Sequence, residues 1–313
     1  MTDEEYIRNF LDYLRTERGR AESYLESCAT DLHSFSSFLR ATDQTLTLPD
    51  ADTDLVRRWL AARVAGGVKP QSMKRKLSAL RTFYKYLLLK GVVARTPMAG
   101  VGNPRSPRPL PVFARQEEMD RLFDDIPFPD NFFGRRDRLM LLTFYSAGLR
   151  RGELIGLDVS GVSLENSTLR VLGKGSKTRL VPFGPELHEA LSAYMVERAA
   201  LCGSNEGPLF VGTRLTRITP SQVAAVVRRY LSLVTTLPRR SPHVLRHTFA
   251  TVMLNNGADL EAIRRLLGHE SVSTTQIYTH AAFADLAKTY SSAHPRGRAV
   301  ADTASADDEP PVL

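Results

Sequence analysis

The sequence predicts a mainly α-helical protein of two domains with one small antiparallel sheet. Four segments in the N-terminal third repeat apolar residues at helical spacing, a run of prolines follows them, and two short strand-like segments occur only later in the chain. A chain of 313 residues is long enough for two domains, each with its own core. The expected fold class is therefore mainly α (α+β).

The N-terminal domain is expected to contain four helices, at about residues 3–17, 20–42, 53–65 and 70–90. Thr2 and Glu5 have the spacing of a capping box at the start of the first helix. In the fourth helix, one apolar stripe consists of Met73, Leu77, Leu80, Tyr84 and Leu87. The basic stripe beside it consists of Lys74, Arg81 and Lys85. The apolar face should therefore pack into a core, while the basic face meets either solvent or phosphate.

A proline-rich segment separates this domain from the next. Residues 95–111 contain five prolines and three arginines: Pro97, Pro104, Pro107, Pro109, Pro111, Arg95, Arg105 and Arg108. Proline at this density prevents helix formation and strand pairing, so the segment should be an extended linker whose arginines, Arg105 and Arg108 included, can follow a nucleic-acid backbone. The expected boundaries are an N-terminal domain at residues 1–107, a second domain at 112–291 and a disordered acidic tail at 292–313.

The charge balance favours an anionic polymer as partner. The chain has 42 lysines and arginines against 34 aspartates and glutamates, and a pI near 9.6. Four acids lie near the C-terminus, at Asp302, Asp307, Asp308 and Glu309; removing them leaves 42 basic and 30 acidic residues, a net charge of +12. Many soluble proteins are modestly basic for no specific reason, but a surplus of this size favours nucleic acid.

Other features of the composition favour a cytoplasmic protein without a membrane partner. No apolar run approaches the roughly 18 residues that a membrane span needs, and no signal peptide is recognisable. Cys28 and Cys202 both fall within apolar helical patterns, which fits a reducing compartment.

Residues 241–280 carry the densest group of candidate functional side chains. Ser241 followed by Pro242 is typical of a helix start, so a helix should begin there and end at the following Asn-Asn-Gly sequence. His243 and Arg246 are three residues apart on this helix and therefore share a face. An imidazole and a guanidinium presented together favour a phosphodiester as their target.

The same stretch contains two further candidates. A second helix at residues 259–267 should end at Gly268, which leaves His269 at a helix C-terminus. Tyr278 follows on a segment rich in serine and threonine. Each residue alone is more often structural than functional, but their combination in one short window is much harder to explain by chance.

Two alternative chemistries fail on detail. A zinc site at His243 and His247 is not supported, because Val244 stands where the HExxH pattern requires glutamate. Residues 173–178 read GKGSKT and join two predicted strands, at 167–172 and 179–182, as a hairpin turn. This turn lacks the spacing of a Walker A loop, so ATP use is not supported. Without other evidence, Lys174 in this turn is best interpreted as a solvent-exposed lysine with no functional role.

Four stretches of the chain resemble the signature boxes of the tyrosine recombinases. They are AGLRRGELIGLD at 147–158, GKGSKTRLVP at 173–182, HVLRHTFAT at 243–251 and LLGHESVSTTQIYTH at 266–280. The resemblance covers about residues 3–297 and is greatest to the Xer-type branch. It implies an N-terminal four-helix DNA-binding domain and a mostly helical catalytic domain with a small antiparallel sheet.

The chemistry of phosphoryl transfer then suggests a role for each residue. A tyrosine hydroxyl with a pKa of about 10 needs a base and a charge-neutralised phosphate. The expected catalytic set is Arg150 and Arg246 as phosphate clamp, His243 as base, Lys174 as acid, His269 as hydrogen-bond donor and Tyr278 as nucleophile, with Glu153 in support. Lys74, Arg81, Lys85, Arg105 and Arg108 are the expected DNA contacts. Neither a metal nor another cofactor is required.

The resemblance also implies partners and leaves alternatives open. The expected partner is a double-stranded recombination site, bound by a homo-tetramer or by a hetero-tetramer with a paralogous recombinase. An apolar stripe after the nucleophile consists of Phe283, Leu286, Ala287 and Tyr290, and the resemblance favours its docking on a neighbouring protomer over its own domain. Resolution of chromosome or plasmid dimers is the favoured role. Integration of a mobile element, a type IB topoisomerase and a DNA-binding regulator are the alternatives.

Overall fold

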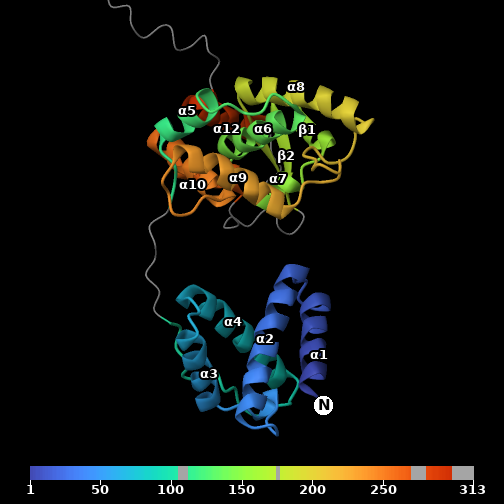
Figure 1. Ribbon diagram of the computed structural model, residues 1–313, viewed down its shortest axis with the longest axis vertical. Helices are drawn as coiled ribbons and strands as arrows, with labels where there is room; N and C mark the ends of the chain where they lie inside the picture. The colour runs from blue at the N-terminus through green and yellow to red at the C-terminus, as the bar shows by residue number, and fades with distance from the viewer. Residues whose placement is uncertain (105–111, 174–176, 269–279, 298–313) are drawn as a thin grey trace, which may run out of the picture. The chain divides into compact units, whose positions relative to one another are not determined.

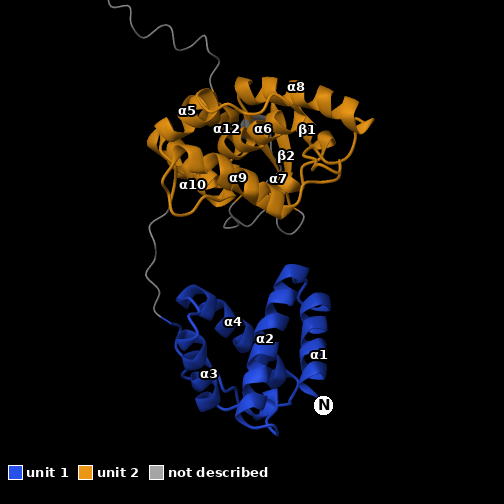
Figure 2. Ribbon diagram, in the orientation of Figure 1, with its two compact units in different colours: residues 1–109 blue, residues 110–313 orange. Residues whose placement is uncertain are grey.

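The structure is a computed structural model that describes residues 1–104, 112–173, 177–268 and 280–297. The chain divides into two compact units, residues 1–109 and 110–313 (Figure 2), and each is described by itself. Within the described residues both units are mainly helical, and the second also contains a three-stranded antiparallel sheet. The predicted fold class is confirmed.

In its described part, residues 1–104, the first unit has four α-helices that pack around an aromatic core. They are α1 (Asp3–Thr16), α2 (Glu22–Thr42), α3 (Thr53–Ala65) and α4 (Pro70–Leu89), as Figure 1 shows. Thr2 and Glu5 form the predicted capping box, in which the backbone N–H of Thr2 donates to Glu5 Oε2 at 2.7 Å. All five residues of the apolar stripe on α4 are buried. Helical periodicity therefore identified the buried face of α4 before any tertiary contact was known.

The linker was expected to begin at residue 95, but in the structure the chain still packs on the first unit beyond that residue. Met98 and Val101 are both 7% exposed and belong to the core of the first unit. The Arg81 guanidinium holds this segment through bonds to the Asn103 side chain at 2.7 Å and the Val101 carbonyl at 2.6 Å. Residues 95–104 are thus packed against the helices because two apolar side chains between the prolines can be buried there.

The second unit contains the sheet and the remaining helices. Its helices are α5 (Gln116–Asp124), α6 (Phe132–Ala147), α7 (Arg151–Ile155), α8 (Pro185–Cys202), α9 (Pro220–Val234), α10 (Pro242–Asn255), α11 (Leu260–Leu267) and α12 (His280–Ala293). The strands β1 (Val162–Ser163), β2 (Thr168–Leu172) and β3 (Thr178–Pro182) lie in that order. The register pairs Val171 with Arg179 and Leu169 with Val181. Of these strands, β2 and β3 were predicted and β1 was not, because two residues are too short to show an alternating pattern.

Helix α6 is the centre of this unit and determines where the site begins. It contacts α8 and α10, and its C-terminal half is entirely buried. Gly148 ends the helix in a left-handed conformation with φ of 59°, and a Cβ there would lie 2.6 Å from the Phe249 ring. Only glycine fits this turn, which directs the chain into Arg150 and α7.

The last helix packs on its own domain, contrary to the expectation that its apolar stripe docks on a neighbour. Leu286 and Tyr290 are 5% and 2% exposed and belong to the core of the second unit, while the side chain of Phe283 lies outside the described residues. Burying an aromatic ring and a leucine within the domain is favourable for a single chain, so no partner is needed to cover them.

The ordered chain also continues beyond residue 291, where the domain was expected to end. Helix α12 reaches Ala293, and His294 is buried with its ring stacked on that of Tyr290. Burial lowers the pKa of His294 to about 3, so the ring is neutral and its Nε2 lies 3.2 Å from the Tyr145 carbonyl oxygen. Arg296 then pairs with Glu186 at 2.6 Å. These contacts fix the end of α12 to the domain that precedes it.

Within the described residues, no helix is both long and apolar enough to span a membrane.

Candidate active site

One carboxylate in the second unit is surrounded by three guanidinium groups. Glu153 on α7 accepts hydrogen bonds from Arg150 Nη1 at 2.7 Å and from Arg179 Nη1 and Nη2 at 2.9 and 2.8 Å. Its Oε2 also lies 3.7 Å from Arg246 Nη1. We call Arg150, Arg179 and Arg246 the arginine cluster. It joins the turn after α6, strand β3 and helix α10 at a single carboxylate.

Backbone carbonyls at the C-terminus of α11 hold the same three arginines. Arg179 Nε donates to the carbonyl of Leu266 at 2.9 Å, and Arg246 Nη2 donates to that of Leu267 at 2.7 Å. Arg150 Nη2 donates to the carbonyl of Gly268 at 3.2 Å. Carbonyls at a helix C-terminus lack partners within the helix and carry partial negative charge, so cations are favoured there.

The cluster changes the acid–base properties of its members. Burial alone raises the pKa of Glu153, but the bonds and charge of Arg179 and the N–H of Arg150 outweigh it and hold the pKa at about 2. Burial, followed by the charge of Arg150, lowers the pKa of Arg246 to about 10. At neutral pH the glutamate is therefore ionised and the arginine remains charged. One carboxylate against three guanidiniums leaves a net positive charge at this point.

His243 lies on the exposed side of α10, one turn before Arg246. The helix begins at Pro242 as predicted, although the Ser241 side chain makes no capping bond. Arg246 is 7% exposed whereas His243 is exposed. Partial desolvation, together with nearby positive charges that include Arg246, lowers the pKa of His243. A neutral imidazole at physiological pH can accept a proton.

The structure brings together some of the predicted site residues and leaves others undescribed. Arg150, Glu153 and Arg246 are in direct contact, and His243 lies on the same helix as Arg246. Residues outside the described part are Lys174, His269, Tyr278, Arg105 and Arg108. In the first unit, Lys85 is exposed, Lys74 is half-buried, and Arg81 bonds to the segment after α4.

Arg179 was missed by the sequence analysis, although a signal for it exists. Along β3 the burial alternates, and Arg179 shares the inward face with Val181. An arginine at an inward position of a strand must find a carboxylate or carbonyl, because burying an unpaired charge is costly. The period of two along the strand therefore indicates a buried ion pair but not its partner.

Glu153→Gln is expected to lower the free energy of unfolding at pH 7 by about 3 kcal/mol, at roughly 1.4 kcal/mol for each unit by which the pKa is depressed. The folded-state pKa of Glu153 lies below its ordinary value of 4.5. Its contribution is therefore complete above about pH 4.5 and is lost as the pH falls toward 2. Urea unfolding of both proteins, followed by circular dichroism at several pH values, measures the difference.

The difference in stability between wild type and Glu153→Gln should narrow as the pH falls below 4.5. Glu165→Gln removes an exposed carboxylate of the same unit and is the matched control, for which little change is expected. A difference that stays constant down to pH 3 would contradict the assigned pKa of Glu153.

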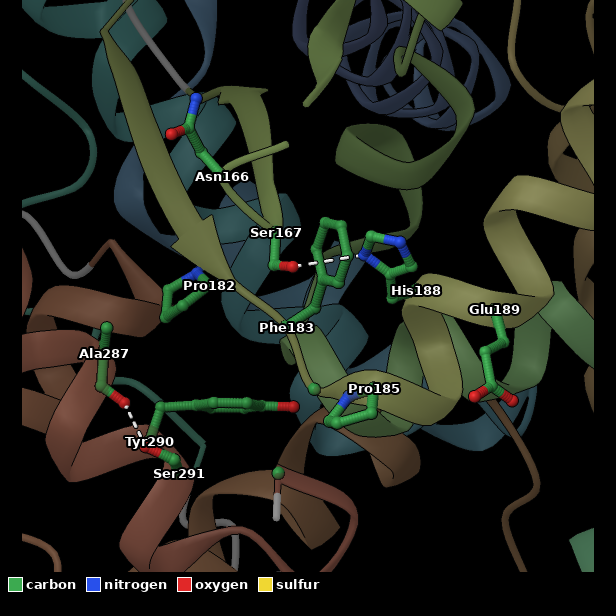
Figure 3. Close-up of a pocket in the computed structure, with 12 residues that line it drawn as sticks. Asn166, Ser167, Pro182, Phe183, Pro185, His188, Glu189, Ala287, Tyr290 and Ser291 are labelled. Carbon is green, nitrogen blue, oxygen red and sulfur yellow. Dashed lines mark hydrogen bonds between the residues drawn. The ribbon is translucent and has the colours of Figure 1, made fainter. Parts of the chain in front are cut away.

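A cavity elsewhere in the second unit does not coincide with the arginine cluster. Its volume is ≈ 380 Å³, and the described residues that line it include Ser167, Phe183, His188 and Tyr290 (Figure 3). In this cavity Ser167 Oγ lies 3.2 Å from His188 Nδ1. Of the predicted catalytic residues that the structure describes, Arg150, His243 and Arg246, none lines it. A cavity of this volume suits a small molecule, whereas a duplex needs an exposed cationic surface.

Comparison with known proteins identifies the class of protein. Residues 113–285 match the model of the phage integrase family, and residues 7–91 match that of the phage integrase N-terminal SAM-like domain. The chain therefore belongs to the phage integrase family. It is a tyrosine recombinase, an enzyme that breaks and rejoins DNA strands at specific sites.

The individual relatives are of the Xer type. Tyrosine recombinase XerC of Pelobacter propionicus is 40% identical over 295 residues, covering 94% of this chain and 96% of the relative. Tyrosine recombinase XerD of Pseudomonas putida is 39% identical over 297 residues, covering 94% and 99%. The resemblance to Xer-type recombinases inferred from the motifs is confirmed.

Solved structures share the fold. XerH bound to a palindromic difH substrate, in a post-cleavage complex, has a TM-score of 0.69 at 21% identity and covers 91% of this chain and 84% of its own. A λ integrase tetramer bound to a Holliday junction has a TM-score of 0.64 at 17% identity, with coverage of 88% and 81%. At these identities the likeness concerns the fold.

Proposed function

We propose that this recombinase cuts each strand with Tyr278, forms a 3′-phosphotyrosyl intermediate and exchanges strands through a Holliday junction, so as to resolve chromosome or plasmid dimers. The observation that carries the proposal is the arrangement of Arg150 and Arg246 around Glu153. Two guanidiniums are held side by side by buried partners before any DNA arrives. Preorganised donors of this kind stabilise charge that develops on a phosphate in the transition state.

The two arginines retain donors for a phosphate. A guanidinium has five N–H groups. Among the described residues, hydrogen bonds from Arg246 reach the carbonyls of Gly148 and Leu267, so three of its donors remain. The Arg150 guanidinium donates three hydrogen bonds to described residues, and the Arg150 side chain is 38% exposed. Both can therefore donate to the two non-bridging oxygens of one phosphodiester.

The chemical step follows from these positions. The Tyr278 hydroxyl attacks the phosphorus, the new O–P bond replaces the bond to the 5′ oxygen, and the tyrosine proton passes to His243. Lys174 protonates the departing 5′ oxygen, and His269 donates a hydrogen bond to the phosphate. The phosphodiester energy is kept in the phosphotyrosyl bond. A free 5′ hydroxyl from another strand can reverse the step without nucleotide hydrolysis.

Assembly and cellular role rest on the relatives. A λ integrase structure is a tetramer on a Holliday junction, and the curated relatives carry the names XerC and XerD. By analogy, this chain acts in the cytoplasm as a tetramer on DNA, either with copies of itself or with a paralogous recombinase. Because α12 already packs on its own domain, the contact between protomers must use other surfaces or the residues after Gly297.

A recombination assay tests the proposal. The substrate is a plasmid that carries two direct copies of the duplex to which the protein binds most tightly. We expect excision of the intervening segment in EDTA and without ATP, because the arginines supply the charge neutralisation. Addition of the paralogue tests the need for a hetero-tetramer. A requirement for metal would contradict the mechanism, and a binding site beside a mobile element rather than near the replication terminus would favour integration.

A further inference from the structure

A second arginine directly follows Arg150 and has no assigned role in the chemistry. Arg151 is the first residue of α7 and is exposed. No described residue forms an ion pair or a hydrogen bond with its guanidinium. By contrast, the three arginines at the start of α6 each have an acidic partner: Arg135 pairs with Asp130, Arg136 with Asp137 and Arg138 with Glu186. In the described part of this unit, Arg151 is thus an unneutralised cation beside the arginine cluster.

Arg151 lies close enough to His243 for its charge to act on the imidazole. Its charge acts on the His243 ring together with the charges of His247, Arg246 and Arg150, and it contributes more than Arg150 does to the lowered pKa of His243. His247 is also exposed and lies one turn further along α10. An exposed guanidinium with no acidic partner among the described residues favours an anion beside it. Because the Arg151 guanidinium stays charged at physiological pH, the surface formed by Arg151, His243 and His247 is suited to binding an anion whether the imidazoles are neutral or protonated.

The spacing identifies the kind of anion. Arg150 and Arg151 are adjacent, so their Cα atoms lie about 3.8 Å apart. A long arginine side chain extends several ångströms beyond its Cα, and phosphates recur every ~3.4 Å along the axis of each strand. With Arg150 on the scissile phosphate, a second phosphate of the same strand falls within reach of Arg151. A polyanionic backbone therefore suits this pair of arginines better than an isolated anion does.

We propose that Arg151 binds a phosphate next to the scissile one on the cleaved strand and thereby fixes the position of the strand on the arginine cluster. This proposal rests on the proposed function, because the scissile phosphate is taken to lie on Arg150 and Arg246. Arg151 is a positioning residue: it holds DNA and makes no contact with the reacting atoms. Its loss should weaken binding and leave the cleavage step of bound DNA nearly intact.

The test is a double-mutant cycle that combines substitutions of Arg151 with the neutralisation of single phosphates in the DNA. The probe is a duplex selected for tight binding from a random pool, with its cleavage position mapped on a nicked version. Each member of a series carries one neutral methylphosphonate in place of one phosphate. The dissociation constant of each duplex is measured for wild type, Arg151→Gln and Arg151→Lys. Arg135→Gln is the matched control, since it makes the same change in net charge about 20 Å away along α6.

Replacing one phosphate next to the scissile one with methylphosphonate should raise the dissociation constant of wild type. The same replacement should not raise the dissociation constant of Arg151→Gln any further. Arg151→Lys should restore the sensitivity, because it restores the charge. The slope of log K against log salt should fall by about 0.9 in Arg151→Gln and stay unchanged in Arg135→Gln. Single-turnover cleavage by saturating Arg151→Gln should match wild type.

Two results would overturn the proposal. Equal sensitivity of wild type and Arg151→Gln at every phosphate would mean that Arg151 contacts none of them. Coupling only at the scissile phosphate would place Arg151 in the clamp itself. Failure of the proposed function gives a different result: wild type would form no covalent product on the nicked duplex, whereas the binding cycle would still report on Arg151.

Discussion

Tyr278→Phe is expected to abolish covalent capture of DNA while leaving DNA binding nearly unchanged. The substitution removes one oxygen, and in the proposed mechanism that oxygen is the atom that forms the bond to phosphorus. Tyr278 is not a member of the arginine cluster, so the charges proposed to bind the phosphate, those of Arg150 and Arg246, are unchanged by the substitution. A nicked duplex that loses a short 5′ fragment after cleavage traps the intermediate, and a denaturing gel measures the covalent product.

Tyr290→Phe is the matched control for this experiment. It removes a hydroxyl from a tyrosine of α12 that is 2% exposed and packed against His294, so it should retain covalent capture. Binding of both variants is measured on the same duplex without the nick. If Tyr278→Phe captured DNA at the wild-type level, another residue would be the nucleophile and the proposed mechanism would be wrong.

Arg150→Ala is expected to lower the single-turnover cleavage rate by about 10² to 10³, the usual effect of losing one preorganised donor to a developing oxyanion. Arg246→Ala should have at least as large an effect, since Arg246 is more deeply buried and also bonds to Gly148 and Leu267. Binding should change less than cleavage, because many other phosphates are contacted. Rapid quenching of reactions with saturating enzyme measures the rate.

The conservative variants separate charge from geometry. Arg150→Lys keeps the charge but cannot donate two parallel bonds, so its rate should lie between those of wild type and Arg150→Ala. Arg135→Ala, at the opposite end of α6, serves as the control for loss of an arginine. Circular dichroism establishes that each variant is folded. A folded Arg150→Ala protein that cleaves at the normal rate would remove Arg150 from the clamp.

Glu153 and Arg179 explain how the clamp can exist before DNA binds. Arginines held close together repel one another, and burying a guanidinium costs free energy unless it is paired. The Glu153 carboxylate and the α11 carbonyls offset both costs. Arg179 donates to Glu153 and Leu266 through all three of its nitrogens, so it fixes the carboxylate beside Arg150 and Arg246, the two arginines proposed to bind phosphate.

The position of α12 changes how assembly must be studied. Removing the chain after Thr279 would take Leu286, Tyr290 and His294 out of the domain core. Such a truncation is expected to destabilise the domain and cannot isolate a contact between protomers.

The sequence by itself determined the helices and the hairpin, and it indicated which residues are candidates for the chemistry. Periods of 3.6 and 2 residues reflect local backbone geometry and the burial of one face, so α4, α10 and the strands β2 and β3 could be predicted from their own residues. His243 and Arg246 were placed on one face for the same reason. The signature stretches were sufficient to indicate the family, which the comparisons confirm.

Only the tertiary structure decided which of these elements meet. Arg179 joins Glu153 across 26 residues and Leu266 across 87, and no local pattern records such distances. The structure likewise placed Met98 in the first core and α12 on its own domain. A periodic pattern shows that a face must be buried but not what buries it, because burial of apolar surface is not directional and any complementary face can supply it.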